Sequence, residues 1–310
     1  MTELLYILEN ISLPIIILIS AGFLFQKIFR TDTGAVSKIV LYLFTPVTVF
    51  VYLYKSEITL DFFALLFLFM LMLQGAMFIV GAALSAVMKY NRSTRGAVIN
   101  AMVFMNTGNY GFPLIALVFQ SNAVTAASQV FIVALQNLTS FTFGVFQASS
   151  GQSVPRKKAL GSVVRMPAIY AVLLAAALNL SGIKIPGFIR VPMEYISSAF
   201  IAVALAALGM QLAEVKLNSR LKDLFIVSAV KVAAVPLAAF GIITILGVKG
   251  ILAPALLIGV STPTAVNTAL LAREFGNEPD FAAQIVLLTT LICTFSLPFI
   301  IYFAKTYFGF

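Results

Sequence analysis

Long apolar runs alternate with short polar breaks along nearly the whole 310-residue chain. Each run is long enough to cross a bilayer as an α-helix, which takes roughly 20 residues. We place ten segments, in chain order: Leu4–Phe25, Ala35–Leu53, Phe62–Met88, Ala97–Phe119, Ala123–Ala148, Val163–Leu180, Val191–Leu212, Leu224–Leu246, Ile251–Leu271 and Phe281–Phe308. The runs are too long, and alternate too little, for β-barrel strands. The pattern therefore predicts an all-α integral membrane protein with ten transmembrane helices.

Two of these segments contain polar residues at mid-membrane. The fourth carries "MNTGNYGFPL" at Met105–Leu114, and the ninth carries "STPTAVN" at Ser261–Asn267. A break in a helix leaves N–H and C=O groups unpaired, so it survives only where protein, water or a ligand meets them. Glycine permits unusual backbone angles and proline lacks a donor. We therefore expect four residues to break the helices: Gly108, Gly111, Pro113 and Pro263.

The chain divides at its midpoint into two halves. A polar loop, residues 151–162, separates five segments in residues 1–150 from five in residues 163–310. An odd number of crossings per half predicts an inverted repeat, with "NTGN" (Asn106–Asn109) matched by "TAVN" (Thr264–Asn267). Interrupted helices at matching positions of two inverted halves indicate a transporter's binding site. Chance is the alternative, because membrane helices tolerate glycine and proline.

Basic residues give the orientation. With the N-terminus outside, fourteen of the 20 Lys and Arg fall on the cytoplasmic side, in loops or at the ends of segments: Lys27, Arg30, Lys38, Lys89, Arg92, Arg95, Arg156, Lys157, Lys158, Arg165, Lys216, Arg220, Lys222 and Arg273. Five fall outside: Lys55, Lys184, Arg190, Lys249 and Lys305. Positive charge favours the cytoplasmic side, so we expect both termini outside. The net charge of +9 is then a topology signal and not a nucleic-acid surface.

Composition excludes several kinds of chemistry. Of all residues, 61% are hydrophobic and 10% are charged, histidine is absent, and Cys293 is the single cysteine. Imidazole metal sites, histidine catalysis and an intramolecular disulfide are therefore excluded. Glu3 and Glu9 replace the basic start of a signal peptide, so the first segment reads as a retained helix. Without a deep carboxylate pair or a cofactor motif, we expect neither an enzyme nor a cofactor; a channel or a non-transporting sensor remains an alternative.

Polar side chains near the breaks form the candidate binding site. Half-helix N-termini attract anions and C-termini attract cations, while amides and hydroxyls can hold a carboxylate or an ion. The predicted binding residues are Asn106, Thr107, Asn109, Gln136, Asn137, Thr262, Thr264, Asn267 and Lys231. A buried lysine costs at least about 2.5–3.5 kcal/mol on insertion scales. Lys231 either snorkels to the surface, or supplies a fixed positive charge for an anion or in place of a coupling cation.

Several of these stretches resemble the auxin efflux carrier family of membrane transporters, which includes the plant PIN exporters and bacterial relatives. The similar stretches are "GFPL" at Gly111–Leu114, "LQN" at Leu135–Asn137 and "STPTAVNTALLAREF" at Ser261–Phe275. Where plant members carry a proline and a serine, this chain has Met105 and Val49. The resemblance therefore does not assign auxin as the substrate.

The resemblance implies an elevator-type secondary carrier. Each half would give two helices to a scaffold and three to a transport domain, and the broken helices would cross beside a site for carboxylate-bearing solutes. It also implies a homodimer formed through the scaffold, and the compact chain suggests a bacterial inner membrane. We therefore expect a small organic anion as substrate and the lipid bilayer as partner, with export driven by membrane potential. A sodium- or proton-coupled importer or antiporter, with sodium at the crossing, is the alternative.

Overall fold

The computed structural model describes residues 2–56, 59–149, 167–217 and 220–310. The described residues form the following α-helices and π-helical turns: α1 (Thr2–Ile7), η1 (Leu8–Ser12), α2 (Leu13–Phe29), α3 (Thr33–Ile39), η2 (Val40–Phe44), α4 (Thr45–Lys55), α5 (Leu60–Val87), α6 (Arg92–Val103), η3 (Thr107–Gly111), α7 (Phe112–Val118), α8 (Ala123–Thr139), η4 (Ser140–Gly144), α9 (Val145–Ala148), α11 (Pro167–Ser181), α12 (Gly187–Glu214), α13 (Leu221–Ile245), α14 (Leu252–Val260), α15 (Val266–Glu274) and α16 (Pro279–Phe308). The all-helical prediction is confirmed for these residues.

Seven helices in the described part of the chain are long and apolar enough to cross a membrane: Glu3–Phe29, Thr33–Lys55, Leu60–Val87, Ala123–Ala148, Gly187–Glu214, Leu221–Ile245 and Pro279–Phe308. α11 is a shorter apolar helix, and the start of the predicted sixth segment and the loop 151–162 lie outside the described residues. The predicted fourth and ninth segments are each divided into two short helices. The structure is that of an integral membrane protein; ten crossings and an inverted repeat stay predictions.

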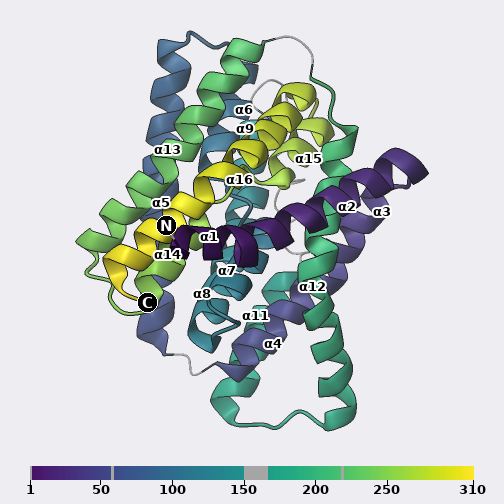
Figure 1. The fold of residues 1–310 in the computed structure, drawn as a ribbon, viewed down its shortest axis with the longest axis vertical. Coiled ribbons are helices and arrows are strands. Elements are labelled where there is room, and N and C mark those ends of the chain that lie inside the picture. The colour runs from purple at the N-terminus through teal and green to yellow at the C-terminus, as the bar shows by residue number, and fades with distance from the viewer. Residues whose placement is uncertain (1, 57–58, 150–166, 218–219) are drawn as a thin grey trace.

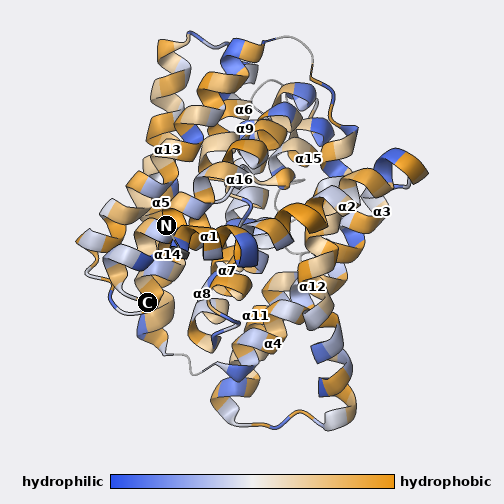
Figure 2. Ribbon diagram, in the orientation of Figure 1, coloured by the Kyte–Doolittle hydropathy of each residue, from blue (hydrophilic) through white to orange (hydrophobic). Residues whose placement is uncertain are grey.

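The helices pack as two groups (Figure 1). α2, α4, α11 and α12 contact one another and, with α3, form what we call the α12 group. α5, α6, α13, α14, α15 and α16 contact one another and, with α7 and α8, form the crossing group. In Figure 1 the crossing group occupies the left and centre of the molecule, and the α12 group lies to the right of it and below it. Figure 2 shows hydrophobic residues along most of the long helices, as expected for helices that face lipid.

Two glycines bring α2 and α12 into close contact. A Cβ added at Gly22 would lie 2.0 Å from the carbonyl oxygen of Ala206, and one at Gly209 would lie 1.9 Å from that of Ile19. Small residues at such points let helix backbones approach closely, which drives packing in membranes, where burial of apolar surface contributes little. Backbone-to-backbone packing therefore joins α2 to α12.

Candidate functional site

The two interrupted segments meet each other at their breaks. α6 ends at Val103 and α14 ends at Val260, and the backbone is extended at Phe104, directly after α6, and at Ala265, directly before α15. Met105 and Thr264 form an antiparallel β-bridge. The N–H of Asn106 donates to the carbonyl oxygen of Pro263 at 2.7 Å, and the N–H of Ala265 donates to that of Phe104 at 3.1 Å. The two breaks thus satisfy each other's backbone groups, which lipid could not do. We call this contact the crossing.

Two glutamines of α8 support the crossing from one side. Gln136 pairs with both backbone groups of Met105: its Oε1 accepts from the N–H at 3.1 Å, and its Nε2 donates to the carbonyl oxygen. Gln129 Nε2 donates to the carbonyl oxygens of Thr107 at 2.8 Å and Gly259 at 3.3 Å. Gln129 therefore links the two interrupted segments directly. Seven residues separate the two glutamines, so both lie on one face of the helix.

The glycines of the fourth segment do not act as we expected. Neither Gly108 nor Gly111 has a positive φ, and Gly111 is helical with φ −68° and ψ −42°. What Gly111 provides is space: a Cβ there would lie 2.6 Å from Gln129 Nε2, and one at Gly259 would lie 2.1 Å from Gln129 Oε1. The glutamine fits only because both glycines lack a side chain.

Of the two prolines that we expected to break the helices, one lies in a break and the other does not. Pro263 lies within the break between α14 and α15, as expected. Pro113 lies in the first turn of α7, after the π-helical turn η3, and not in the break itself. η3 runs directly into α7, since the N–H of Phe112 donates to the carbonyl oxygen of Gly108, so Pro113 removes the N–H that an α-helix would direct to the carbonyl oxygen of Asn109.

Lys231 supports the crossing from a different helix, α13. Its side chain is 1% exposed, and Nζ donates to the carbonyl oxygens of Met102 at 2.7 Å and Phe104 at 3.4 Å. These are the carbonyls at the C-terminal end of α6, where a half-helix dipole favours positive charge. The lysine does not snorkel.

Two threonines are buried in the crossing. Thr264 Oγ1 donates to the carbonyl oxygen of Ala101 at 3.2 Å, and its N–H donates to Thr289 Oγ1 at 3.1 Å. Thr262 is 2% exposed, and its hydroxyl has no partner among the described residues. Neither threonine lines the cavity described next, and Lys231 does not line it either.

A cavity of about 350 Å³ lies against the crossing, between the two helix groups. Seven of the predicted site residues line it: Asn106, Thr107, Gly108, Asn109, Gln136, Asn137 and Asn267. The opposite wall comes from the α12 group, with residues 34–45 together with Ala207 and Gln211. The cavity has the size of a small organic molecule. We call it the crossing cavity.

Two residues that line this cavity carry buried polar atoms without a partner. Asn106 is 5% exposed and Thr107 is 1% exposed, yet Asn106 Nδ2 and Thr107 Oγ1 have no hydrogen-bond partner among the described residues. The helical turns that start at Thr107 and Val266 both begin at the cavity wall, so their first N–H groups lie nearby. A buried donor without a partner is costly, which indicates that a ligand or water completes the site.

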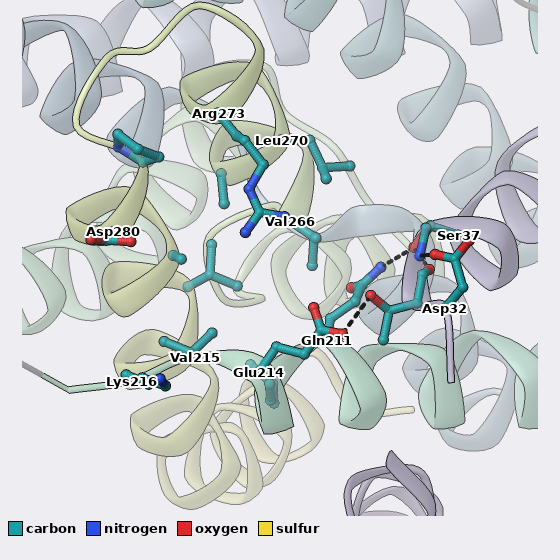
Figure 3. Close-up of a pocket in the computed structure, with 17 residues that line it drawn as sticks. Asp32, Ser37, Gln211, Glu214, Val215, Lys216, Val266, Leu270, Arg273 and Asp280 are labelled. Carbon is teal, nitrogen blue, oxygen red and sulfur yellow. Dashed lines mark hydrogen bonds between the residues drawn. The ribbon is translucent and has the colours of Figure 1, made fainter. Parts of the chain in front are cut away.

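A second cavity of about 520 Å³ adjoins the first (Figure 3). Five residues line both cavities, so the two are adjacent: Gly34, Ser37, Gln211, Val266 and Leu270. At their junction Gln211 Nε2 donates to Ser37 Oγ at 2.7 Å. Asp32, Lys216 and Asp280 are among the charged residues that line this cavity. We call this cavity the vestibule.

Neither Gln129 nor Gln211 is among the residues that the sequence predicts for the site. An amide in an apolar segment indicates a hydrogen bond, but the sequence does not identify the partner. The partners of Gln129 are the carbonyl oxygens of Thr107 and Gly259, which lie on two other helices. Among the described residues, no cluster of three or more His, Cys, Asp or Glu could hold a metal ion.

A multi-pass membrane protein with a solute-sized cavity at a crossing of interrupted helices has the features of a transporter. The family model described as "Membrane transport protein" matches residues 6–159 and 153–301. The chain therefore belongs to this family, the auxin efflux carrier family, which confirms the resemblance found in the sequence.

Two archaeal proteins are similar along nearly their whole length. An uncharacterized transporter of Methanothermobacter thermautotrophicus is 24% identical over 291 residues, which cover 92% of this chain and 95% of the relative. An uncharacterized transporter of Methanocaldococcus jannaschii is 25% identical over 301 residues, which cover 93% and 95%. The protein is thus a membrane transporter by family.

Proposed function

We propose that the protein is a secondary transporter that exports a small organic anion by moving the crossing group along the α12 group. The observation that carries this proposal is the unpaired, buried Asn106 Nδ2 in the wall of a 350 Å³ cavity. A carboxylate oxygen is an acceptor without a donor of its own, and so complements this amide and the N–H groups of two helix N-termini.

The position of the cavity supports an elevator-type mechanism. One wall comes from the crossing group and the other from the α12 group, so a sliding motion between the groups would change access to the cavity. The vestibule continues the cavity towards the face that charge assigns to the cytoplasm. This arrangement corresponds to an inward-facing state, from which export would begin.

Lys231 supports export without a coupling ion. Its amino group occupies the C-terminal end of α6, the position that would attract a cation. A fixed positive charge there would stand in place of sodium. An inside-negative potential then favours anion export by about 2.3 kcal/mol per charge per 100 mV. Coupled import or antiport would instead require an ion at the crossing.

Counterflow in proteoliposomes tests this proposal. We expect a loaded unlabelled carboxylate to drive uptake of the labelled compound without sodium, and Asn106→Ala to abolish that uptake. Asn10→Ala is the matched control, because Asn10 is exposed and bonds only within its own helix, to the Tyr6 carbonyl oxygen at 3.1 Å. Full exchange by Asn106→Ala would overturn the site. Conduction without counterflow would indicate a channel, and absence of any flux a sensor.

A further inference from the structure

Charged side chains from both helix groups line the vestibule. The wall on the α12 group side contains Asp32 and Glu214, at the start of α3 and the end of α12. The wall on the crossing group contains Arg273, in the last turn of α15. Figure 3 shows the Arg273 side chain extending from α15 into the open space, towards Glu214 on the other wall.

Hydrogen bonds hold the acidic wall in place. Glu214 Oε1 accepts from Gln26 Nε2 at 3.1 Å and from Thr33 Oγ1 at 2.9 Å. Asp32 Oδ1 caps α3 by accepting from the N–H of Gly34 at 2.9 Å. All of these partners belong to α2, α3 and the turn between them, so the two carboxylates move with the α12 group.

Arg273 is not held in this way. Within the described ranges, no hydrogen bond or ion pair engages its guanidinium. Arg220 provides a contrast: it forms ion pairs with Asp223 at 3.2 Å and Glu278 at 3.5 Å. An arginine that faces fixed carboxylates across an open cavity can form an ion pair with them when the cavity narrows.

Other charged residues also line the vestibule. Asp280 lies in the first turn of α16, and the carbonyl oxygen of Lys216, which follows α12, accepts from Gln284 Nε2 of α16 at 2.7 Å. Lys216 is therefore held against the crossing group, and Arg273 and Glu214 are the charged residues whose separation depends on how far the two groups lie apart.

We propose that the vestibule is the gate on the face that charge assigns to the cytoplasm, and that Arg273 closes it by pairing with Glu214 when the crossing group moves. This inference rests on the proposed alternating access. In the open state the Arg273 guanidinium and the Glu214 carboxylate are hydrated, and the attraction between them is screened. On closure, water leaves the vestibule and the attraction strengthens, so the pair stabilises the closed state specifically. The charge pair is thus a conformational device and does not bind the substrate.

Charge exchange tests the pair in the full-length transporter reconstituted in liposomes. Glu214→Arg and Arg273→Glu each place like charges on facing walls, and we expect each to slow carboxylate counterflow by about tenfold. The double variant Glu214→Arg/Arg273→Glu restores the opposite signs and should recover most of the rate. Lys222→Glu, on the same face but outside the vestibule, is the control and should leave the rate unchanged. Failure of the folded double variant to recover the rate would overturn the pairing.

Cross-linking provides a readout that needs no substrate. In a Cys293→Ser background, Glu214→Cys and Arg273→Cys together should be joined by a bifunctional thiol reagent whose length matches the Arg–Glu pair that it replaces, because closure brings the two side chains into contact. Each single-cysteine variant should form no such intramolecular link. If no carboxylate is exchanged but the cross-link forms, the proposed substrate class fails and the gate stands. If the folded double-cysteine variant never cross-links, the gate proposal is wrong.

Discussion

The N–H of Asn106 donates to the carbonyl oxygen of Pro263 across 2.7 Å, and this bond joins two segments that lie 157 positions apart in the chain. The backbone of Asn106 is therefore used in the crossing, while its side-chain amide remains unpaired in the cavity wall. One residue thus belongs both to the architecture and to the proposed site. Substitutions can separate the two roles, because they change only the side chain.

Asn106→Ala should remove ligand binding with little cost in stability. The lost Nδ2 atom makes no hydrogen bond within the described protein, and the backbone bond to Pro263 stays. We expect the free energy of unfolding without ligand to change by less than about 1 kcal/mol. Thermal unfolding in detergent measures this change. A large loss of stability would mean that the amide has a structural role after all.

Gln129 and Gly259 should behave as a coupled pair. Gly259→Ala places a Cβ 2.1 Å from the Gln129 side chain, and we expect overpacking to cost about 1–3 kcal/mol. Gln129→Ala leaves the carbonyl oxygens of Thr107 and Gly259 without this donor, at a cost of about 1–3 kcal/mol.

The double variant Gln129→Ala/Gly259→Ala relieves the clash, so it should be about 1 kcal/mol more stable than the sum of the single effects. A double-mutant cycle on unfolding free energies measures this coupling. Gly75→Ala is the control, since no atom lies within 4 Å of its added Cβ. Additive effects would contradict the contact between Gln129 and Gly259.

Gly209→Ala should disrupt the α12 group. Its Cβ would lie 1.9 Å from the carbonyl oxygen of Ile19, so α2 and α12 must move apart, at a cost of about 1–3 kcal/mol or more. Gly241→Ala, in α13, meets no atom within 4 Å and should gain up to about 1 kcal/mol from helix propensity. Melting temperatures of the two variants should shift in opposite directions. Equal shifts would argue against the close helix contact.

Lys231→Met tests whether the lysine replaces a coupling cation. The substitution keeps the length of the side chain but leaves the carbonyl oxygens of Met102 and Phe104 without this donor. We expect slower counterflow that sodium partly restores and choline does not, whereas the unchanged protein should be insensitive to sodium. Dependence of the unchanged protein on sodium would instead support a coupled importer or antiporter.

The sequence predicted the helices well, because hydropathy acts locally along the chain. The predicted segment Phe62–Met88 corresponds to α5 at Leu60–Val87, and Val191–Leu212 lies within α12 at Gly187–Glu214. The breaks were also visible, since asparagine and proline are rare in lipid. The roles of the glycines were not visible in the sequence. Gly259 lies in an apolar run, and a side chain is excluded there only because Gln129, 130 residues away in the chain, packs against it.

The candidate site was predicted only in part, because the sequence shows local patterns and not the packing of distant helices. Polar residues beside a break are recognisable, and Asn106, Asn137 and Asn267 do line one cavity. Which side of the crossing a residue faces depends on the packing of helices, which the local pattern does not contain. Lys231 was therefore grouped with the binding residues, although the structure places its amino group on the carbonyls of α6.

A thermal-shift screen of the purified protein against small carboxylates tests the central claim most directly. A ligand present at 100 times its dissociation constant adds about 2.7 kcal/mol of stability. We predict that a carboxylate stabilises the unchanged protein without sodium, and that Asn106→Ala removes this effect while Asn10→Ala keeps it. Stabilisation by sodium alone, or a carboxylate effect that persists in Asn106→Ala, would contradict a carboxylate site at the crossing.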